Sequence, residues 1–382
     1  GLVDLHTHLR EPGDEAAETV ASGARAAARG GYTAVVAMAN TDPPIDSAPV
    51  ARDVLSLGAG APCEVAVAGA ITVGRGGGQI APLAEMAALG VRIFSDDGRG
   101  VQDAGVLRRA LEYASDLGVV VAEHCEDESL SKGGHMNEGA VSARLGIPAQ
   151  PASAEEVLVI RDLELAALTG ATMHFCHLST RRSVALVAEA RRRGLPVSCE
   201  VTPHHLALSE SAVSSFDPRF KVNPPLRTDD DVEALREACA GGEVDAIATD
   251  HAPHTDARKE ATFDEAPFGM IGLETAYAVA YSVLVAGRPG KAVPIRDVIG
   301  LLSWRPARIA GLHLSSGHGG PIAPGAIAHL CVFDPTERWV VDPKSFASRS
   351  HNSPFSGTEL CGRVRHTIFR GEPVVVDGLA AK

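Results

Sequence analysis

Two histidines near the start of the chain, His6 and His8, are separated by a single residue. They end an apolar run over residues 2–6 that is typical of a β-strand, and alternate side chains of a strand point to the same side. Both imidazoles can therefore reach one metal ion. A pair of this kind is also compatible with ordinary surface or core histidines, so the metal assignment depends on the rest of the chain.

Four further nitrogen or oxygen ligands each follow a later apolar run that is typical of a strand. In a barrel or sheet of parallel strands, the ends of these runs meet on one face. Six such ligands with no competing thiolate suit one or two Zn²⁺ ions and leave positions for water or substrate. The four additional candidates are Asp97, His124, His177 and Asp250.

Two metal ions would need a bridging anion, and Asp97 is the carboxylate best placed to supply it. Its neighbour Asp96 could take this role instead. Both residues could also cap the turn at residues 95–98, since aspartate commonly accepts backbone hydrogen bonds there.

The segments that must position these residues alternate short β-branched apolar runs with longer runs of helical period. Eight βα units predict an α/β fold of the (β/α)8 TIM-barrel type. The predicted strands cover residues 2–6, 34–39, 64–70, 91–94, 119–123, 172–176, 196–201 and 245–249. Helices are predicted at residues 18–29, 80–89, 106–117, 155–168 and 183–193.

Two longer inserts, residues 126–152 and 206–235, follow the ends of predicted strands, where barrel enzymes place their active-site loops. After about residue 312 the pattern changes to short strands separated by Gly, Pro and Asp turns. The sequence therefore predicts a barrel domain over residues 1–312, with the metal site, and a small β-rich appendage over 313–382. Its strands are predicted at residues 329–333, 338–341, 364–369 and 373–376.

Charge and composition exclude several classes of protein. The formal net charge is −13 and no basic tract is longer than residues 191–193, which argues against a nucleic-acid partner. No apolar run reaches about 18 residues and no signal peptide is visible, so we expect a cytoplasmic protein without a membrane partner. The seven cysteines include no CxxC pair and are expected to be reduced core residues.

Seven motifs together resemble dihydroorotases of the bacterial type I class, within the amidohydrolase superfamily. They occur in order along the chain, and the match runs from residue 1 past residue 275. The motifs are HTHLREPG (6–13), MANT (38–41), FSDDG (94–98), HCED (124–127), HLST (177–180), VNPPLR (222–227) and TDHAPH (249–254).

The resemblance implies two Zn²⁺ ions with separate ligand sets. His6, His8 and Asp250 would hold one ion, and His124 and His177 the other. Asp97 would bridge them in place of the carboxylated lysine of many relatives. The sequence agrees, because no lysine precedes Lys132, which lies in a Gly-rich loop where a surface role is expected.

The activity implied by the resemblance is the reversible interconversion of N-carbamoyl-L-aspartate and L-dihydroorotate in de novo pyrimidine (UMP) biosynthesis. Zinc would lower the pKa of a bound water and polarise the carbonyl, and Asp250 would be the catalytic residue that moves the proton. A guanidinium binds a carboxylate through two parallel hydrogen bonds, so Arg10 is the candidate for the substrate carboxylate. By resemblance, the substrate-binding residues are His8, Arg10, Asn40, Asn223, His254, Phe268 and Gly269.

Simpler roles remain open for several of these residues. Arg10 could be a surface residue paired with Glu11, Asn223 a turn former before two prolines, and His254 a residue that orients a ligand. The adjacent His204 and His205 point opposite ways, so at most one faces the site and neither is assigned. His251 should face away from Asp250 for the same reason.

Three alternative functions accompany this interpretation. Hydantoinases (dihydropyrimidinases) and allantoinases use the same fold on other cyclic ureides, but Arg10 argues against both. A noncatalytic dihydroorotase-like partner of aspartate transcarbamoylase would typically lose metal ligands, and all six are present here. By resemblance we expect a homodimer and a possible contact with aspartate transcarbamoylase.

The appendage carries one further expectation. Members of the family have a few tens of residues ahead of the His-x-His strand that complete a small β sandwich with the C-terminal strands. Residues 313–382 are therefore expected to form half of a composite sandwich whose N-terminal half is missing from this sequence. Limited proteolysis should then find residues 329–376 poorly supported compared with the barrel.

Overall fold

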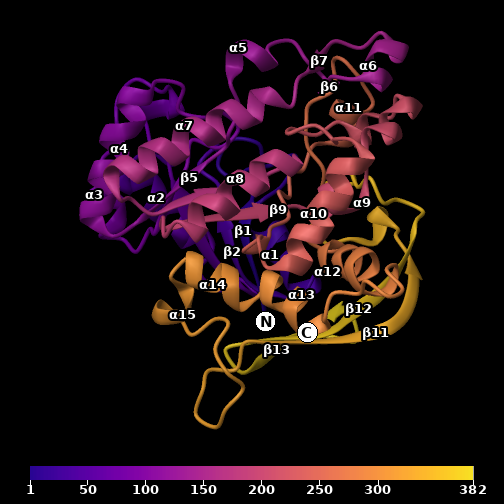
Figure 1. The fold of residues 1–382 in the computed structure, drawn as a ribbon. Coiled ribbons are helices and arrows are strands. Elements are labelled where there is room, and N and C mark those ends of the chain that lie inside the picture. The colour runs from indigo at the N-terminus through magenta and orange to yellow at the C-terminus, as the bar shows by residue number, and fades with distance from the viewer. Residues whose placement is uncertain (382) are drawn as a thin grey trace.

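The computed structural model describes residues 1–381, and its centre is a parallel sheet of eight strands curled into a barrel (Figure 1). The last strand meets the first through a bridge between His251 and Thr7 and a hydrogen bond from Thr249 N to Asp4 Oδ1 of 2.9 Å. The predicted barrel is thus confirmed. In spatial order the strands are β1 (Leu2–Thr7), β2 (Tyr32–Ala37), β3 (Glu64–Gly69), β4 (Ile93–Phe94), β5 (Val120–Glu123), β8 (Met173–Phe175), β9 (Val197–Val201) and β10 (Ala246–Ile247).

Helices cover the outside of the barrel, which explains why the strands are apolar without alternation. All six residues of β1 and of β2 are buried. Several helices start at a side-chain cap, as where Thr19 and Ser22 cap each other at the start of α1. The covering helices are α1 (Val20–Arg29), α2 (Ala48–Leu57), α3 (Leu83–Ala87), α4 (Ala104–Leu117), α7 (Ser153–Thr169), α8 (Arg181–Arg192), α10 (Asp229–Gly241), α12 (Ala276–Tyr281), α13 (Ile295–Leu302), α14 (Trp304–Ile309) and α15 (Leu312–Ser315).

Each of the five predicted helices is present, and the largest difference in length is at α3. The prediction covered residues 80–89, whereas the helix begins at Leu83 and ends at Ala87. Pro82 explains the late start, because its ring disfavours helical backbone at the residue before it. Gly90, with φ of 97°, follows the helix at its other end.

The two predicted inserts follow β5 and β9 and are built from short elements. The first contains α5 (Glu128–Ser131), α6 (Ala140–Leu145) and a two-stranded sheet, and it lies at the top of Figure 1. The strands of that sheet are β6 (Met136–Asn137) and β7 (Ala149–Gln150). In the second insert, α9 (Pro203–Ala207) is followed by the 3-10 turns η2 (Glu210–Ser215) and η3 (Pro218–Phe220). A further short helix, α11 (Asp256–Lys259), follows β10.

The C-terminal strands form a separate antiparallel sheet that lies beside α12 at the lower right of Figure 1. The prediction of two strands at residues 329–333 and 338–341 was wrong, because both belong to the single strand β11 (Leu330–Val340). A register shift between Asp334 and Arg338 explains the error, since the bulged residues look like a turn in the sequence. The other strands are β12 (Glu359–Phe369), β13 (Glu372–Val376) and β14 (Leu379–Ala380). The domain boundary at residue 312 stays a prediction, as does the second half of a sandwich.

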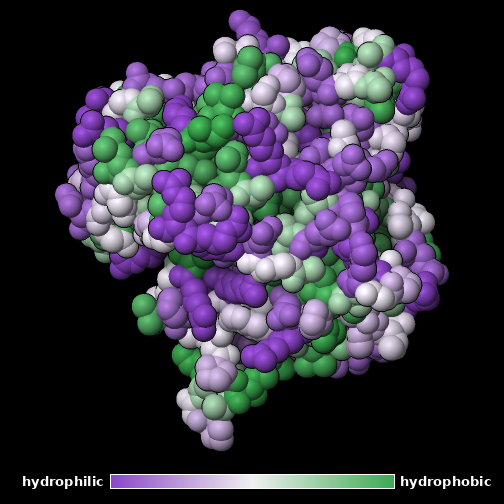
Figure 2. All heavy atoms as spheres, viewed as in Figure 1, coloured by the Kyte–Doolittle hydropathy of each residue, from purple (hydrophilic) through white to green (hydrophobic). Residues whose placement is uncertain are grey.

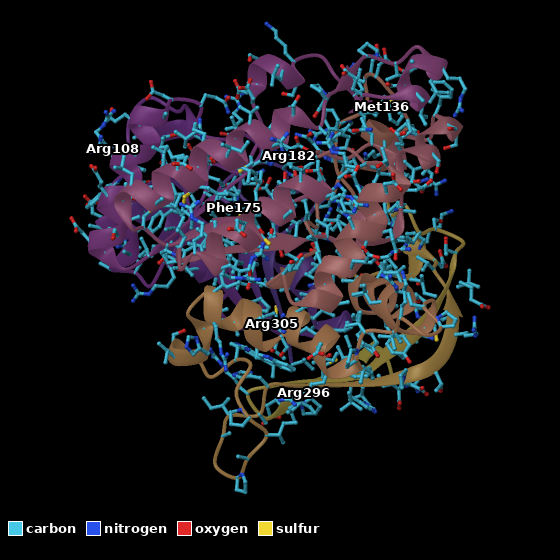
Figure 3. All side chains as sticks on the ribbon, in the orientation of Figure 1. Arg108, Met136, Phe175, Arg182, Arg296 and Arg305 are labelled. Atoms are coloured by element: carbon cyan, nitrogen blue, oxygen red, sulfur yellow. The ribbon has the colours of Figure 1, made fainter. Side chains whose placement is uncertain are left out.

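The barrel interior is filled with small and branched side chains, among them Val3, Ala34 and Ile93. A larger cluster lies between the strands and the helices, and it includes the fully buried Phe175 that Figure 3 labels. Hydrophilic side chains cover much of the outer face, with apolar patches between them (Figure 2). Among residues 1–381, every helix is too short or too polar to cross a lipid bilayer.

Candidate active site

Six side chains converge at the carboxyl ends of the barrel strands, and we call them the ligand cluster. All six are buried. Two groups of three, His6 with His8 and Asp97, and Asp97 with His124 and His177, place their ligand atoms within 4.8 Å of one another. The members of the ligand cluster are His6, His8, Asp97, His124, His177 and Asp250.

Asp97 is the centre of the cluster because it belongs to both groups. Its Oδ1 lies 3.2 Å from His6 Nε2 and 3.5 Å from both His124 Nδ1 and His177 Nε2, and its Oδ2 lies 3.5 Å from His8 Nε2. Asp250 completes the set, with Oδ1 3.0 Å from His8 Nε2. The neighbouring Asp96 instead accepts hydrogen bonds from the backbone of Ile71 and Thr72.

Three of the four cluster histidines have an oxygen acceptor on the ring nitrogen that faces away from the cluster. His6 Nδ1 lies 2.9 Å from Glu200 Oε1, His8 Nδ1 lies 2.8 Å from Asn40 Oδ1, and His124 Nε2 lies 3.1 Å from Glu126 Oε2. A hydrogen on each of these nitrogens leaves the other nitrogen bare and aimed into the cluster. Metal-ligating histidines are commonly held in this way.

The cluster has the donor set and the unpaired atoms that a cation requires. His124 Nδ1 lies 2.9 Å from His177 Nε2, so these two ring nitrogens are close enough to reach the same cation. His6 Nε2 and Asp97 Oδ1 have no aligned hydrogen-bond partner within residues 1–381, although buried polar atoms are rarely unpaired. Nitrogen and oxygen ligands in this number fit one or two zinc ions.

Electrostatics keep the buried carboxylates of the site ionised. Burial alone would raise the pKa of Asp97, but the surrounding imidazoles of His6, His124 and His177 hold it well below its usual value. Burial acts in the same direction on Glu200, and hydrogen bonds from His174 and His6 outweigh it and lower that pKa to about 2. These two carboxylates therefore supply negative charge that can balance a cation.

Strained backbone marks three of the site residues. Arg10, His177 and Asp250 have φ angles of 60°, 31° and 46°, a region that residues with a Cβ rarely adopt. Asp250 is held there partly by its neighbour Thr249, whose N and Oγ1 both donate to the buried Asp4, at 2.9 and 2.5 Å. Asp4 thus fixes the strand end from which Asp250 projects.

Every cluster residue except His6 lines a cavity of about 220 Å³, and every residue predicted to bind substrate lines this cavity. Two loop segments, residues 252–254 and 268–270, also contribute side chains or backbone to the lining of this cavity, and we call them the loop wall. The predicted substrate-binding residues on the cavity are His8, Arg10, Asn40, Asn223, His254, Phe268 and Gly269.

Arg10 is bound to the loop wall, and His254 connects the two segments of the loop wall. Arg10 Nε donates to Pro253 O at 3.1 Å, which leaves its two terminal nitrogens for another acceptor. Burial, together with the charge of Arg10, lowers the pKa of His254 to about 3, so its ring is neutral at pH 7. His254 Nε2 donates to Phe268 O at 2.7 Å and so ties the two segments together.

Two of the residues predicted to bind substrate, Asn40 and Asn223, also contact the cluster histidines or the residues that hold them. Asn40 accepts from His8, as described, so it orients a cluster histidine from the cavity side. Asn223 Nδ2 donates to the Glu126 carboxylate that holds His124. Both amides therefore connect the cluster to the space above it.

The histidines left unassigned by the sequence lie outside the cluster. His205 is bound to Thr202 Oγ1 and Pro224 O, and burial lowers its pKa to about 3. His204 is fully enclosed beside it. His251 faces away from Asp250, as expected, with Nε2 3.3 Å from Glu18 Oε2.

Sequence reasoning missed several residues that support the site. Asp4 and Glu200 are charged residues inside buried strands, and that unusual placement was the signal that could have revealed them. Glu126 stands in the HCED motif but was given no role. Asn352, which contacts the loop wall, lies about 80 residues beyond it and shows no pattern in the sequence.

The arrangement can hold a Lewis-acidic cation, supply a carboxylate beside it and bind an anionic group through Arg10. These are the requirements for hydrolysing an amide in a small molecule that bears a carboxylate.

The comparisons with known proteins agree with this geometry. A family model described as Dihydro-orotase-like matches residues 1–183. The chain is 50% identical to a dihydroorotase of Streptomyces coelicolor, covering 99% of this chain and 88% of the relative. It is 48% identical to a dihydroorotase of Pelotomaculum thermopropionicum, with coverage of 99% and 86%.

Solved structures of hydantoinases share the fold. An L-hydantoinase from Arthrobacter aurescens superposes with a TM-score of 0.88 at 22% identity, and the alignment covers all of this chain and 86% of that chain. At this identity the likeness concerns the fold alone. The family follows from the sequence relatives, which match nearly the whole chain at about half of its positions: the chain belongs to the dihydroorotase family.

Proposed function

We propose that the protein is a zinc-dependent cyclic amidohydrolase that interconverts N-carbamoyl-L-aspartate and L-dihydroorotate in pyrimidine biosynthesis. The observation that carries the proposal is a cluster of nitrogen and oxygen ligands, five of which line the same cavity as Arg10. The names of the sequence relatives support the choice of substrate.

His6, His8 and Asp250 would hold one zinc ion, His124 and His177 a second, and Asp97 would contact both. Bound zinc lowers the pKa of a water molecule and polarises an amide carbonyl. The shared position of Asp97 supports two ions.

Asp250 would move the proton. Its carboxylate lines the cavity, lies 3.0 Å from His8 Nε2 and is ionised, because the neighbouring imidazoles of His8 and His6 overcome burial and lower its pKa. In ring opening it accepts the proton of the attacking water and returns it to the ring nitrogen as the C–N bond breaks. In ring closure it removes the proton of the ureido nitrogen, and water leaves.

Arg10 and Asn40 would select substrates with a free carboxylate. The terminal nitrogens of Arg10 can form two parallel hydrogen bonds to that group, and Asn40 presents its amide hydrogens on the same cavity. Asn223, His254 and the main chain of Phe268 and Gly269 would bind the ring. A hydantoin or dihydrouracil ring without the carboxylate would leave the Arg10 charge unpaired, which weakens its binding.

The deciding experiment follows the ultraviolet absorbance of L-dihydroorotate during ring opening, with zinc measured on the same samples. We expect turnover in the parent and a loss of about 100- to 10,000-fold in kcat for Asp250→Asn, the range for general acid–base catalysis. Hydantoin and dihydrouracil serve as comparison substrates. A zinc-loaded parent that acts on them and is inert on dihydroorotate would reject the proposed substrate.

The remaining parts of the proposal follow from family resemblance. They are a homodimer, a contact with aspartate transcarbamoylase and a cytoplasmic location. Size-exclusion chromatography with and without the transcarbamoylase addresses the first two.

A further inference from the structure

The loop wall is held from behind by a segment that belongs to neither the barrel strands nor the ligand cluster. Residues 345–352 follow β11, begin at the last residue of the 3-10 turn η5 (Pro343–Ser345) and precede β12. We call them the C-terminal tether. The tether is fastened to the barrel at several points before it reaches the loop wall.

Two buried carboxylates of the barrel fasten the first part of the tether. Glu274 Oε1 accepts from Ala347 N at 2.7 Å and from Ser348 N at 3.3 Å. Glu18 accepts from Ser348 Oγ and from Arg349 N, and it also contacts Ser22 and His251 inside the barrel domain. These bonds fix where the end of the tether lies.

Asn352 stands at that end with its side chain buried against the loop wall. Its Nδ2 donates to Ala252 O at 3.0 Å and to Gly269 O at 3.1 Å, and its Oδ1 accepts from His254 N at 3.2 Å. One amide thus satisfies three backbone groups, two on one segment of the loop wall and one on the other.

The contacted positions are those that set the shape of the cavity. Ala252 and His254 flank Pro253, whose carbonyl holds Arg10 Nε, and Gly269 lies in the other segment. Gly269 has a φ of 135°, and a Cβ there would lie 2.8 Å from Ala252 Cβ and 3.0 Å from His254 Nε2. The two segments therefore touch without free space, and a shift of one displaces the other.

We propose that Asn352 is a positioning residue for substrate binding, which sets the spacing of the two loop-wall segments and through Pro253 the place of Arg10. This proposal rests on the proposed function for the identity of the substrate. Asn352 contacts no residue of the ligand cluster in the part of the chain described here, so its effect is on substrate binding and leaves metal binding unchanged.

The first test compares Asn352→Ala with the parent in ring opening of L-dihydroorotate. We expect KM to rise about tenfold, kcat to stay within about twofold, and zinc content to be unchanged. A merely structural role would lower the active fraction, and therefore the apparent kcat, without raising KM. An unchanged KM overturns the proposal.

Ser350→Ala is the matched control. Ser350 is a buried residue of the same tether, but its Oγ donates to Ala17 O at 2.7 Å, away from the loop wall. We expect its KM to equal that of the parent. A rise in KM equal to that of Asn352→Ala would show that general loosening of the tether is sufficient, and would overturn a specific role for Asn352.

Asn352→Asp separates the two halves of the contact. The aspartate keeps an acceptor for His254 N but turns a carboxylate toward the carbonyls of Ala252 and Gly269, so KM should rise at least as much as in the alanine variant. If neither variant folds, Asn352 serves the fold and the proposal is wrong.

Amide hydrogen exchange in the ligand-free proteins keeps the proposal separate from the proposed function. The His254 amide should exchange faster in Asn352→Ala, remain protected in Asn352→Asp and be unaffected in Ser350→Ala. An inert parent would reject the proposed substrate alone, because the exchange comparison does not depend on turnover. Equal exchange of the His254 amide in all four proteins would overturn the positioning role.

Discussion

The ligand cluster and the loop wall both contribute to the lining of one cavity, but they are made from different kinds of structure. All six cluster residues lie in a short barrel strand or within three residues after one. The loop wall consists of irregular segments joined by a backbone hydrogen bond from Ala252 N to Met270 O, by His254 and by Asn352 from the C-terminal tether. Metal binding therefore depends on the strands of the barrel, whereas substrate binding depends on contacts between loops that are distant in the sequence.

The largest expected effect comes from the centre of the cluster. Asp97→Asn removes the charge shared by both ligand groups, so we expect loss of at least one zinc ion and a fall in kcat of at least about 1000-fold, since metal catalysis contributes several kcal/mol. Metal analysis and initial rates measure both. Asp96→Asn is the control, because Asp96 contacts Ile71 and Thr72 and should keep its zinc.

A change on the loop-wall side should leave the metal in place. Arg10→Lys loses the paired hydrogen bonds of a guanidinium, and we expect KM for dihydroorotate to rise about 10- to 100-fold with the zinc content of the parent. Steady-state kinetics with metal analysis test this, and Arg258→Lys, at an exposed arginine paired with Asp14, is the control. Loss of zinc in Arg10→Lys would break the division between the two regions.

Glu200→Gln tests whether a residue that supports the ligand cluster affects zinc binding alone. Glutamine can no longer accept from both His6 and His174 as the carboxylate does, so zinc affinity should fall about 10- to 100-fold. Titration with a zinc chelator measures the affinity. Added zinc should restore turnover with an unchanged KM, and a raised KM at saturating zinc would count against the assignment.

Gly269→Ala should produce a smaller effect on the opposite side. Its φ of 135° and the close approach of Ala252 would force the backbone to move, and we expect KM to rise about tenfold with zinc unchanged. Kinetics of Gly60→Ala provide the control, because Gly60 has a φ of 81° with nothing within 4 Å of an added Cβ. Equal kinetics of the two variants would contradict the close-packing argument.

The smallest effect on catalysis is expected at Glu274, an anchor of the tether. Here the quantity that should change is the pH dependence of the free energy of unfolding. Burial raises the pKa of Glu274 from 4.5 to about 7, so the folded chain binds the proton more tightly than the unfolded chain. This contribution is complete below about pH 4.5 and is lost as pH rises through about 7, a change on the order of 3 kcal/mol. Denaturant unfolding at several pH values should show a flatter profile for Glu274→Gln, and identical profiles would refute the burial argument.

The sequence predicted the barrel strands and the metal ligands better than the side-chain contacts between distant segments. Strand positions and the His-x-His pair follow from local periodicity, which the barrel preserves. The contact of Glu200 with His6 could not be predicted, because only the closed barrel brings β9 and β1 together. The contact of Asn352 with the loop wall could not be predicted either, because no local pattern shows where the C-terminal tether lies. Bulges also escape periodicity, which is why β11 was predicted as two strands.

The separation of the metal ligands along the chain has a consequence for how the protein is made. His6 and His8 leave the ribosome first and Asp250 is added 244 residues later, as numbered in the sequence. At synthesis rates of about 5–20 residues per second, this interval is about 12 to 50 seconds. A nascent chain therefore offers an incomplete chelate for most of its synthesis, and selection of the metal falls to the finished barrel and to the metal supply of the cell at the moment of release.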